Sequence, residues 1–163
     1  MEPKKSALVR IVLRIFGLVF GVVVLGCIAD KLYVSPVSGF SKVCYFNRKD
    51  AACDFGIACG ALALVLAIIF CVLDLVTDVM GNAEQARRPA IIAGSALAIV
   101  MGIMWLACFG YLTKLWVDVD GNDFVDEIKI PGQATLGFSF LSIPIWFAVA
   151  IFGFVALRGG ATS

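Results

Sequence analysis

Four long apolar runs divide the chain, and they constrain its fold more than any other feature of the sequence. They read "RIFGLVFGVVVLGCIA", "FGIACGALALVLAIIFCVLDLV", "AIIAGSALAIVMGIMWLACFGYL" and "TLGFSFLSIPIWFAVAIFGFVAL". The first is lengthened upstream by "ALVRIVL", so each run is long enough to cross a bilayer as a helix of about 20 residues. Hydrocarbon offers backbone N–H and C=O groups no water partner, so each span must be helical. We therefore predict an all-α membrane protein, a four-transmembrane-helix bundle forming a single domain over residues 1–163, with spans at residues 8–29, 55–76, 90–112 and 135–157.

The composition agrees with this class and excludes several functions. Hydrophobic residues make up 61% of the chain, above the roughly 45–50% of soluble domains. A net charge of +1 without a long Lys/Arg run argues against a nucleic-acid partner. The chain has no His, which excludes bis-His haem, His-based metal sites and His general acid or base chemistry. No Ser-His-Asp set or Gly-rich phosphate loop is present either, so we expect no enzyme activity and no cofactor.

An acidic stretch, "DVDGNDFVDE" at residues 118–127, resembles a calcium-binding loop only in composition. With Asp118 as the first ligand, Asp123 stands where the loop needs Gly, and Lys129 stands where it needs a bidentate Glu. We therefore predict a solvated turn and no metal site.

The orientation follows from the distribution of basic residues. The short connection at residues 77–89 shares one side with both termini, and that side is dense in basic residues: Lys4, Lys5, Arg10, Arg14, Arg87, Arg88 and Arg158. The other side carries Lys31, Lys42, Arg48, Lys49, Lys114 and Lys129, spread over the longer loops 30–54 and 113–134. The positive-inside rule then predicts cytosolic N- and C-termini and two luminal loops.

Two of the six cysteines differ from the rest in their surroundings. Cys44 and Cys53 enclose the polar decapeptide "CYFNRKDAAC", so they are the pair with a case for a disulfide, which requires an oxidising lumen or exterior. Their wide spacing favours a structural bridge over a Cys-x-x-Cys redox motif. The other four lie in apolar runs, where cysteine is usually a packing residue: Cys27, Cys59, Cys71 and Cys108.

Arg14 and Asp74 are the ionisable residues most clearly inside predicted spans. An unpaired charge in a span costs about 2.5–3.5 kcal/mol on insertion scales. Antiparallel first and second helices bring the two residues to a similar depth near the cytosolic face, so we predict an intramembrane ion pair. The structural interpretation is a clamp between helices, and the functional alternative is a small channel or transporter with Asp74 and Arg14 in its pathway.

Small residues recur at four-residue spacing in three of the spans. Such spacing lets helix backbones approach closely, which matters in lipid because the hydrophobic effect no longer drives helices together. We predict packing within the bundle in preference to oligomerisation for Gly17, Gly21, Gly56, Gly60, Gly94, Ala98 and Gly102.

Several segments, taken in order, resemble the synaptogyrins, four-span vesicle proteins of the MARVEL-domain group that also includes synaptophysin. These segments are "RIFGLVFGVVVLGCIADKLY", "CYFNRKDAAC", "CVLD", "FGYLTKLW" and "GFSFLSIPIW", and they extend from about Arg14 to about Leu157. The resemblance implies a MARVEL bundle and matches Cys44 and Cys53 to the family's loop cysteines, Arg14 to its first-span arginine, and Asp74 to its second-span aspartate. Animal synaptogyrins generally continue into a cytosolic tail, whereas this sequence ends with "LRGGATS", so functions of that tail are not carried over.

The resemblance also implies a function: a non-enzymatic protein of cytoplasmic or synaptic-like vesicles in vesicle biogenesis, trafficking and the regulation of exocytosis. We expect it to act by membrane shaping and protein clustering. The expected partners are membrane lipids, cholesterol among them, other vesicle membrane proteins and further copies of the chain. A junctional or adhesive role ranks lower, because neither luminal loop carries a long apolar patch in its sequence.

Overall fold

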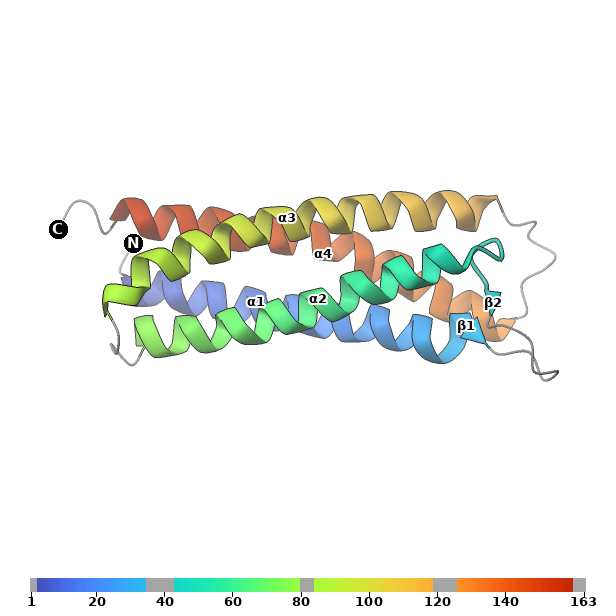
Figure 1. Ribbon diagram of the computed structural model, residues 1–163, viewed down its shortest axis with the longest axis horizontal. Helices are drawn as coiled ribbons and strands as arrows, with labels where there is room; N and C mark the ends of the chain where they lie inside the picture. The colour runs from blue at the N-terminus through green and yellow to red at the C-terminus, as the bar shows by residue number, and fades with distance from the viewer. Residues whose placement is uncertain (1–2, 35–42, 80–83, 119–125, 160–163) are drawn as a thin grey trace.

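The computed structural model describes residues 3–34, 43–79, 84–118 and 126–159, and four long helices account for most of them (Figure 1). They run up and down in alternation, so the start of α1 and the end of α4 lie at one end of the bundle, here called the terminal end. The opposite end carries two short strands and is called the disulfide end. The helices are α1 (Pro3–Cys27), α2 (Asp50–Asp74), α3 (Glu84–Val117) and α4 (Asp126–Gly159).

Two helices continue into a turn of π-helix. The element η1 (Ile28–Leu32) extends α1 at the disulfide end, and η2 (Leu75–Val79) extends α2 at the terminal end. Beyond η1, strand β1 (Tyr33–Val34) pairs antiparallel with β2 (Val43–Cys44), with Tyr33 opposite Cys44. This two-stranded ribbon lies outside the apolar spans, where water can satisfy its open edges.

The helices extend past the predicted spans, so the loop bounds predicted from sequence were wrong. Much of the predicted loop 113–134 is helical, because α3 continues to Val117 and α4 begins at Asp126. Residues 50–54, predicted as loop, form the first turn of α2, and α3 begins at Glu84 inside the predicted turn 77–89. Hydropathy marks where a helix leaves the lipid, whereas backbone hydrogen bonding continues through interfacial residues. Pro89 and Pro131 lie in these extensions, past the first turn of their helices, where each proline lacks the N–H for one helical hydrogen bond.

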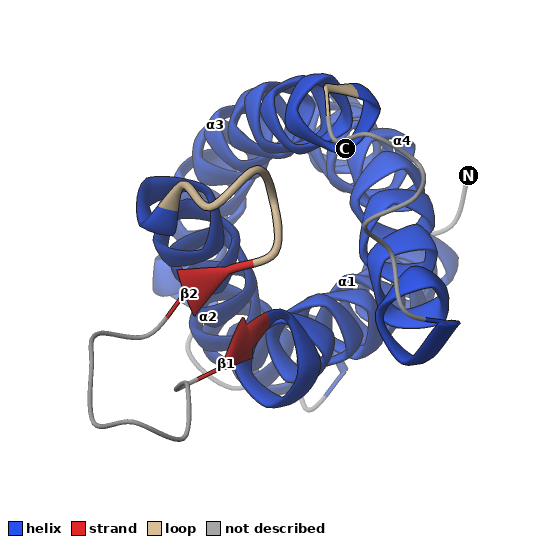
Figure 2. Cartoon of the chain, turned by 90° about the vertical axis from the view of Figure 1, so that its right-hand side faces the viewer, coloured by secondary structure: helices blue, strands red, loops and turns tan. Residues whose placement is uncertain are grey.

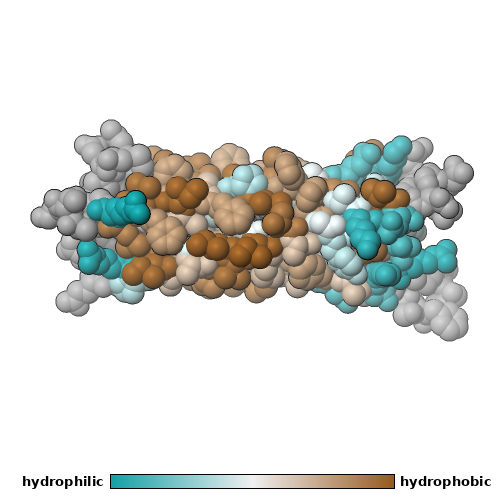
Figure 3. Space-filling view, turned by 90° about the horizontal axis from the view of Figure 1, so that it is seen from above, coloured by the Kyte–Doolittle hydropathy of each residue, from teal (hydrophilic) through white to brown (hydrophobic). Residues whose placement is uncertain are grey.

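The lateral surface of the bundle is apolar. Among the residues that the structure describes, four segments are long and apolar enough to cross a membrane: Leu8–Leu32, Asp50–Thr77, Arg88–Val117 and Ile128–Arg158. Large aliphatic side chains on every helix point outward, among them Ile15, Val65, Ile103 and Ile151. On the face drawn in the space-filling view, a hydrophobic belt lies between two more hydrophilic ends (Figure 3). The chain is therefore a multi-pass membrane protein with a lipid-facing belt.

Within the bundle, small and large side chains face one another. Viewed from the disulfide end, the helices form a ring in the order α1, α2, α3, α4 (Figure 2). The inward face of α2 consists mainly of small residues, whereas α3 and α4 contribute the two largest fully buried side chains, Trp105 and Trp146. This pairing of small with large groups fills the centre while α2 stays close to α1.

Candidate functional site

A buried cluster of charged side chains lies toward the terminal end of the bundle. Asp74, the last residue of α2, forms an ion pair with Arg14 of α1, with 2.8 Å between Arg14 Nε and Asp74 Oδ2. Arg10, one helical turn before Arg14, donates a hydrogen bond from Nη2 to Asp74 Oδ1 over 3.3 Å. The arginine side chains are each 2% exposed and the aspartate side chain 6%. One carboxylate therefore receives two guanidinium groups in surroundings shielded from solvent.

Residues of α2 and α3 complete the surroundings of Arg14. The guanidinium carbon of Arg14 lies 4.9 Å from the ring centroid of Phe70 on α2, a cation–π contact. A Cβ built on Gly94 of α3 would lie 2.9 Å from Arg14 Nη2, so glycine at this position leaves room for the guanidinium. Arg14 therefore contacts side chains or backbone from both α2 and α3, and the cluster ties three helices together at one level.

The structure brings together Arg14 and Asp74, as the sequence predicts, and it adds Arg10, which was not predicted as a partner. That residue was counted only among the basic residues that precede or open the first span. Its spacing of four from Arg14 was the available signal, because residues i and i+4 share one face of a helix. The cluster lies near the terminal end of the bundle, where Arg10 and Arg14 of α1 meet Asp74 of α2.

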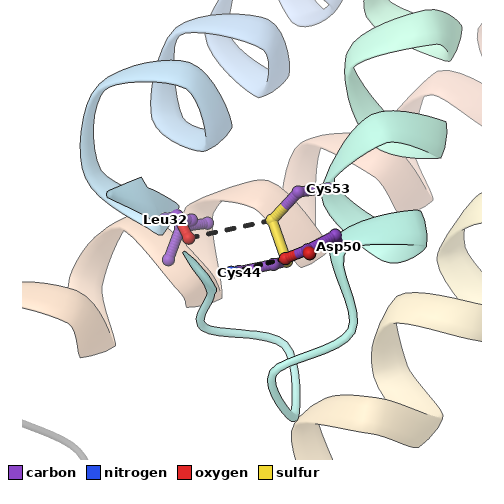
Figure 4. The surroundings of a disulfide bond; sticks show 4 residues. All are labelled: Leu32, Cys44, Asp50 and Cys53. Atoms are coloured by element: carbon purple, nitrogen blue, oxygen red, sulfur yellow. Dashed lines mark hydrogen bonds between the residues drawn. A yellow bond between two sulfur atoms is a disulfide. The ribbon is translucent and has the colours of Figure 1, made fainter. Parts of the chain in front are cut away.

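The other predicted pair lies at the disulfide end. Cys44, the last residue of β2, is disulfide-bonded to Cys53 in the first turn of α2, and both are fully buried. Leu32 O accepts a hydrogen bond from Tyr45 N over 2.9 Å, and Cys53 Sγ lies 3.7 Å from the same oxygen (Figure 4). The sulfur of a disulfide carries no hydrogen, so this second contact is packing. The disulfide thus joins β2 to α2 and packs against the end of η1.

Polar contacts close the loop that the disulfide encloses. Asp50 Oδ1 accepts a hydrogen bond from Cys44 N, and Lys49 N donates to Phe46 O over 3.1 Å. Within that turn, Asn47 and Arg48 both have φ of 53°, a left-handed conformation that glycine usually supplies. Phe46 is buried and its ring lies 5.8 Å from that of Trp116. The loop is therefore anchored at its base and presents Arg48 and Lys49 to solvent.

The predicted packing glycines all face neighbouring helices of the same chain. Cβ atoms built on Gly21 and Gly60 would lie 3.1 and 3.0 Å from each other's carbonyl oxygens, so α1 and α2 meet backbone to backbone. Gly17 faces Trp146, Gly56 faces Ile28, Gly94 faces Arg14 and Phe70, and Gly102 faces Phe147. Within the described part of the chain, Gly26, Gly110 and Gly137 have no such neighbour within 4 Å.

Replacing Gly60 by alanine is expected to lower the free energy of unfolding by about 1–2 kcal/mol, because overpacking against backbone outweighs the gain in helix propensity. Thermal unfolding in detergent micelles measures the change. The matched control is Gly110→Ala, where the new methyl group meets open space and stability should stay the same or rise by up to about 1 kcal/mol. Equal effects of the two substitutions would contradict the close approach of α1 and α2.

No metal centre is apparent among the residues whose side chains are described: none of their His, Cys, Asp and Glu side chains gather in groups of three or more suited to holding an ion. Most of the acidic stretch 118–127 lies outside the described residues.

Comparison with known proteins agrees with the four-span architecture. The family model MARVEL, described as a membrane-associating domain, matches residues 7–155. The chain belongs to this family. The MARVEL-domain match extends from the first turns of α1 almost to the end of α4, so the whole bundle is the domain.

Curated relatives of this MARVEL-domain protein include synaptogyrins. Synaptogyrin-1 of Homo sapiens is 28% identical over 153 residues, and synaptogyrin-2 of Bos taurus is 29% identical over 151 residues. Each alignment covers 93% of this chain, but only 65% of the human protein and 66% of the bovine one. The chain is therefore a synaptogyrin-like MARVEL-domain protein that spans about two thirds of the length of these relatives.

Proposed function

We propose that this chain is a non-enzymatic vesicle membrane protein that acts in vesicle biogenesis and trafficking and regulates exocytosis. The observation that carries the proposal is the match to a membrane-associating domain over residues 7–155 of a four-span bundle, together with relatives named synaptogyrin. The cluster of Arg10, Arg14 and Asp74 serves as a structural clamp in this proposal, since its charges are buried and paired with one another.

The proposed orientation places both termini in the cytosol and the disulfide end in the vesicle lumen. Support comes from the density of Lys and Arg beside the termini and from the disulfide, which persists in oxidising compartments. A thiol-reactive, membrane-impermeant label directed at Asn47→Cys tests it in intact vesicles. The label should react only after the vesicles are permeabilised, and reaction in intact vesicles would reverse the orientation.

The proposed mechanism is membrane shaping and clustering of other proteins. The two ends of the bundle differ in the length of chain they carry: residues 33–49 and 118–125 connect helical segments at the disulfide end, against residues 80–83 at the terminal end. A body with different cross-sections in the two leaflets couples to membrane curvature. The apolar belt offers lateral contacts to lipids, to other vesicle membrane proteins and to further copies.

Reconstitution into liposomes tests this mechanism. At equal protein-to-lipid ratio, the purified chain should be enriched on small liposomes over large ones or should crosslink to itself in the membrane. The matched control is a variant with Cys44 and Cys53 both replaced by alanine, which keeps the spans but loosens the disulfide end. Even distribution between liposome sizes together with a purely monomeric state would contradict the proposal.

A small channel or transporter remains the alternative function. The observation in its favour is the buried charge of Asp74, since ionisable groups inside spans often mark transport pathways. Flux of ions or small solutes across proteoliposomes that disappears with Asp74→Asn would support this alternative. Absence of flux from the unmodified chain would leave the clamp as the role of the cluster.

A further inference from the structure

The interior of the bundle contains polar groups that the chain itself does not satisfy. Outside the ion-pair cluster, four buried side-chain atoms have no hydrogen-bond partner within the described part of the chain: Nε1 of Trp105, Nε1 of Trp146, Oγ of Ser139 and Oγ1 of Thr113. Trp105 and Ser139 are fully buried, and Trp146 is 2% exposed. Buried polar groups in proteins are rarely left without a partner, so these need one.

Ser139 stands out against the other buried hydroxyls of the bundle. Ser95, Thr135 and Ser142 each donate to the carbonyl oxygen four residues earlier in their own helix, all over 2.8 Å. Thr135 and Ser142 share the inward face of α4 with Ser139, which lies between them in sequence. The hydroxyl of Ser139 makes no such bond. Its hydrogen-bonding capacity is therefore available inside the bundle.

The unpartnered groups lie at successive levels of the two neighbouring helices α3 and α4. Gly102 faces Phe147 and Gly132 faces Trp116, which sets the antiparallel register of the two helices. At a rise of about 1.5 Å per residue, this register puts Trp105 and Trp146 about 4 Å apart along the bundle axis. Ser139 lies toward the disulfide end, about 7 Å from Trp105 and about 10 Å from Trp146 along the same axis. Trp146 Nε1 also faces α1, since a Cβ built on Gly17 would lie 3.6 Å from it.

The hydrogen-bond donors and acceptors of these groups determine what kind of molecule can bind between them. An indole N–H only donates, so its partner must accept a hydrogen bond, whereas a serine hydroxyl both donates and accepts. A water molecule can accept from an indole and donate to a serine oxygen. Lipid hydroxyls and headgroups could offer similar bonds, but side chains that are 0–2% exposed are closed to a bulky lipid. Folded proteins hold on the order of one buried water per 27 residues, so a hydrated interior is ordinary in number.

We propose that the MARVEL bundle of this chain holds internal water molecules in its interior, bound by Trp105, Trp146 and Ser139. These waters occupy the middle of the bundle, between the ion-pair cluster at the terminal end and the disulfide end. The apolar core of this protein then contains a short hydrated stretch at the level of Trp105, Trp146 and Ser139.

Magnetisation transfer from water to indole N–H groups tests this proposal in lipid nanodiscs. The three indole signals of the ¹⁵N-labelled chain are assigned with Trp105→Phe, Trp146→Phe and Trp116→Phe. Trp116, half-buried at the disulfide end, serves as an internal reference. We expect cross-peaks with long-lived water for Trp105 and Trp146. If both indoles lack these cross-peaks, the proposal is wrong.

Substitution of Ser139 gives an independent test. The folding equilibrium constant should change in opposite directions depending on whether or not water binds the Ser139 hydroxyl. If water binds Ser139, Ser139→Ala loses a hydrogen bond and should lower the folding equilibrium constant roughly fivefold. If the hydroxyl is dry and unsatisfied, its removal should raise that constant. Ser142→Ala is the matched control. It removes a serine hydroxyl from the same face of α4, but one that donates to Phe138 O within the helix. A constant for Ser139→Ala equal to or above that of the unmodified chain would count against water at this position.

Discussion

Asp74→Asn should lower the free energy of unfolding by about 3–5 kcal/mol, the cost of breaking a buried ion pair by removing one partner. The carboxylate of Asp74 is the shared acceptor of Arg10 and Arg14, whose side chains are 2% exposed. An amide of the same size keeps the shape but offers the two guanidinium groups no negative charge. Both arginines would then lie close together, buried, without this counter-charge.

Thermal unfolding in detergent micelles measures this effect. Asp30→Asn is the matched control, because Asp30 is 74% exposed and pairs with the exposed Lys31 over 3.4 Å. An exposed pair of this kind contributes about 0–1 kcal/mol, so the control should unfold nearly as the unmodified chain does. If Asp74→Asn and Asp30→Asn shifted the unfolding temperature equally, Asp74 would not hold the helices together.

Replacing both Cys44 and Cys53 by alanine is the second large effect we expect. The disulfide spans nine residues of sequence, and closing a loop of about ten residues is worth about 2–3 kcal/mol in the chain-entropy account. Without it, β2 and its turn are held to α2 by Asp50 and to η1 by Leu32. We expect the disulfide end to loosen while the four spans stay helical.

Reduction provides the control for this substitution. A reductant should lower the unfolding temperature of the unmodified chain and leave that of the Cys44→Ala/Cys53→Ala variant unchanged. Cys27→Ala, which removes a free thiol, should leave the sensitivity to reductant intact. Mass spectrometry of the unreduced protein maps the bridge directly. Two free thiols at Cys44 and Cys53 in the native protein would remove the basis for both the bridge and the luminal orientation.

The pairing of Arg14 with Asp74 could be predicted, because an unpaired charge inside a span costs free energy that an opposite charge offsets. The alternation of spans placed the two residues at one level. Arg10 was not found, because at residue 10 the sequence alone does not distinguish a basic residue facing headgroups from one buried in the bundle. Only the rotation of α1 turns both arginines toward α2, where Asp74 has one oxygen for each.

The bounds of the helices were predicted less well than their number. Apolar content marked the lipid-facing portions, but α3 and α4 continue for several residues beyond them. Helical hydrogen bonding has no reason to stop where hydrocarbon stops. The unpartnered hydroxyl of Ser139 was likewise invisible in sequence, since Thr135 and Ser142 on the same face satisfy theirs within α4.

Lipid and redox chemistry impose some features of this protein on any chain with these residues, and those features could be predicted without a structure. Four apolar runs require four helices, since backbone groups in hydrocarbon must bond within their own segment, and polar surroundings singled out Cys44 and Cys53. Only the tertiary structure decided which face of each helix turns inward, and hence that Gly21 meets Gly60 and that Arg10 joins Arg14 at Asp74. In spans that are apolar on every side, the sequence gives little indication of which face turns inward. Lipid and protein interior are equally apolar, so close packing alone selects the inner face.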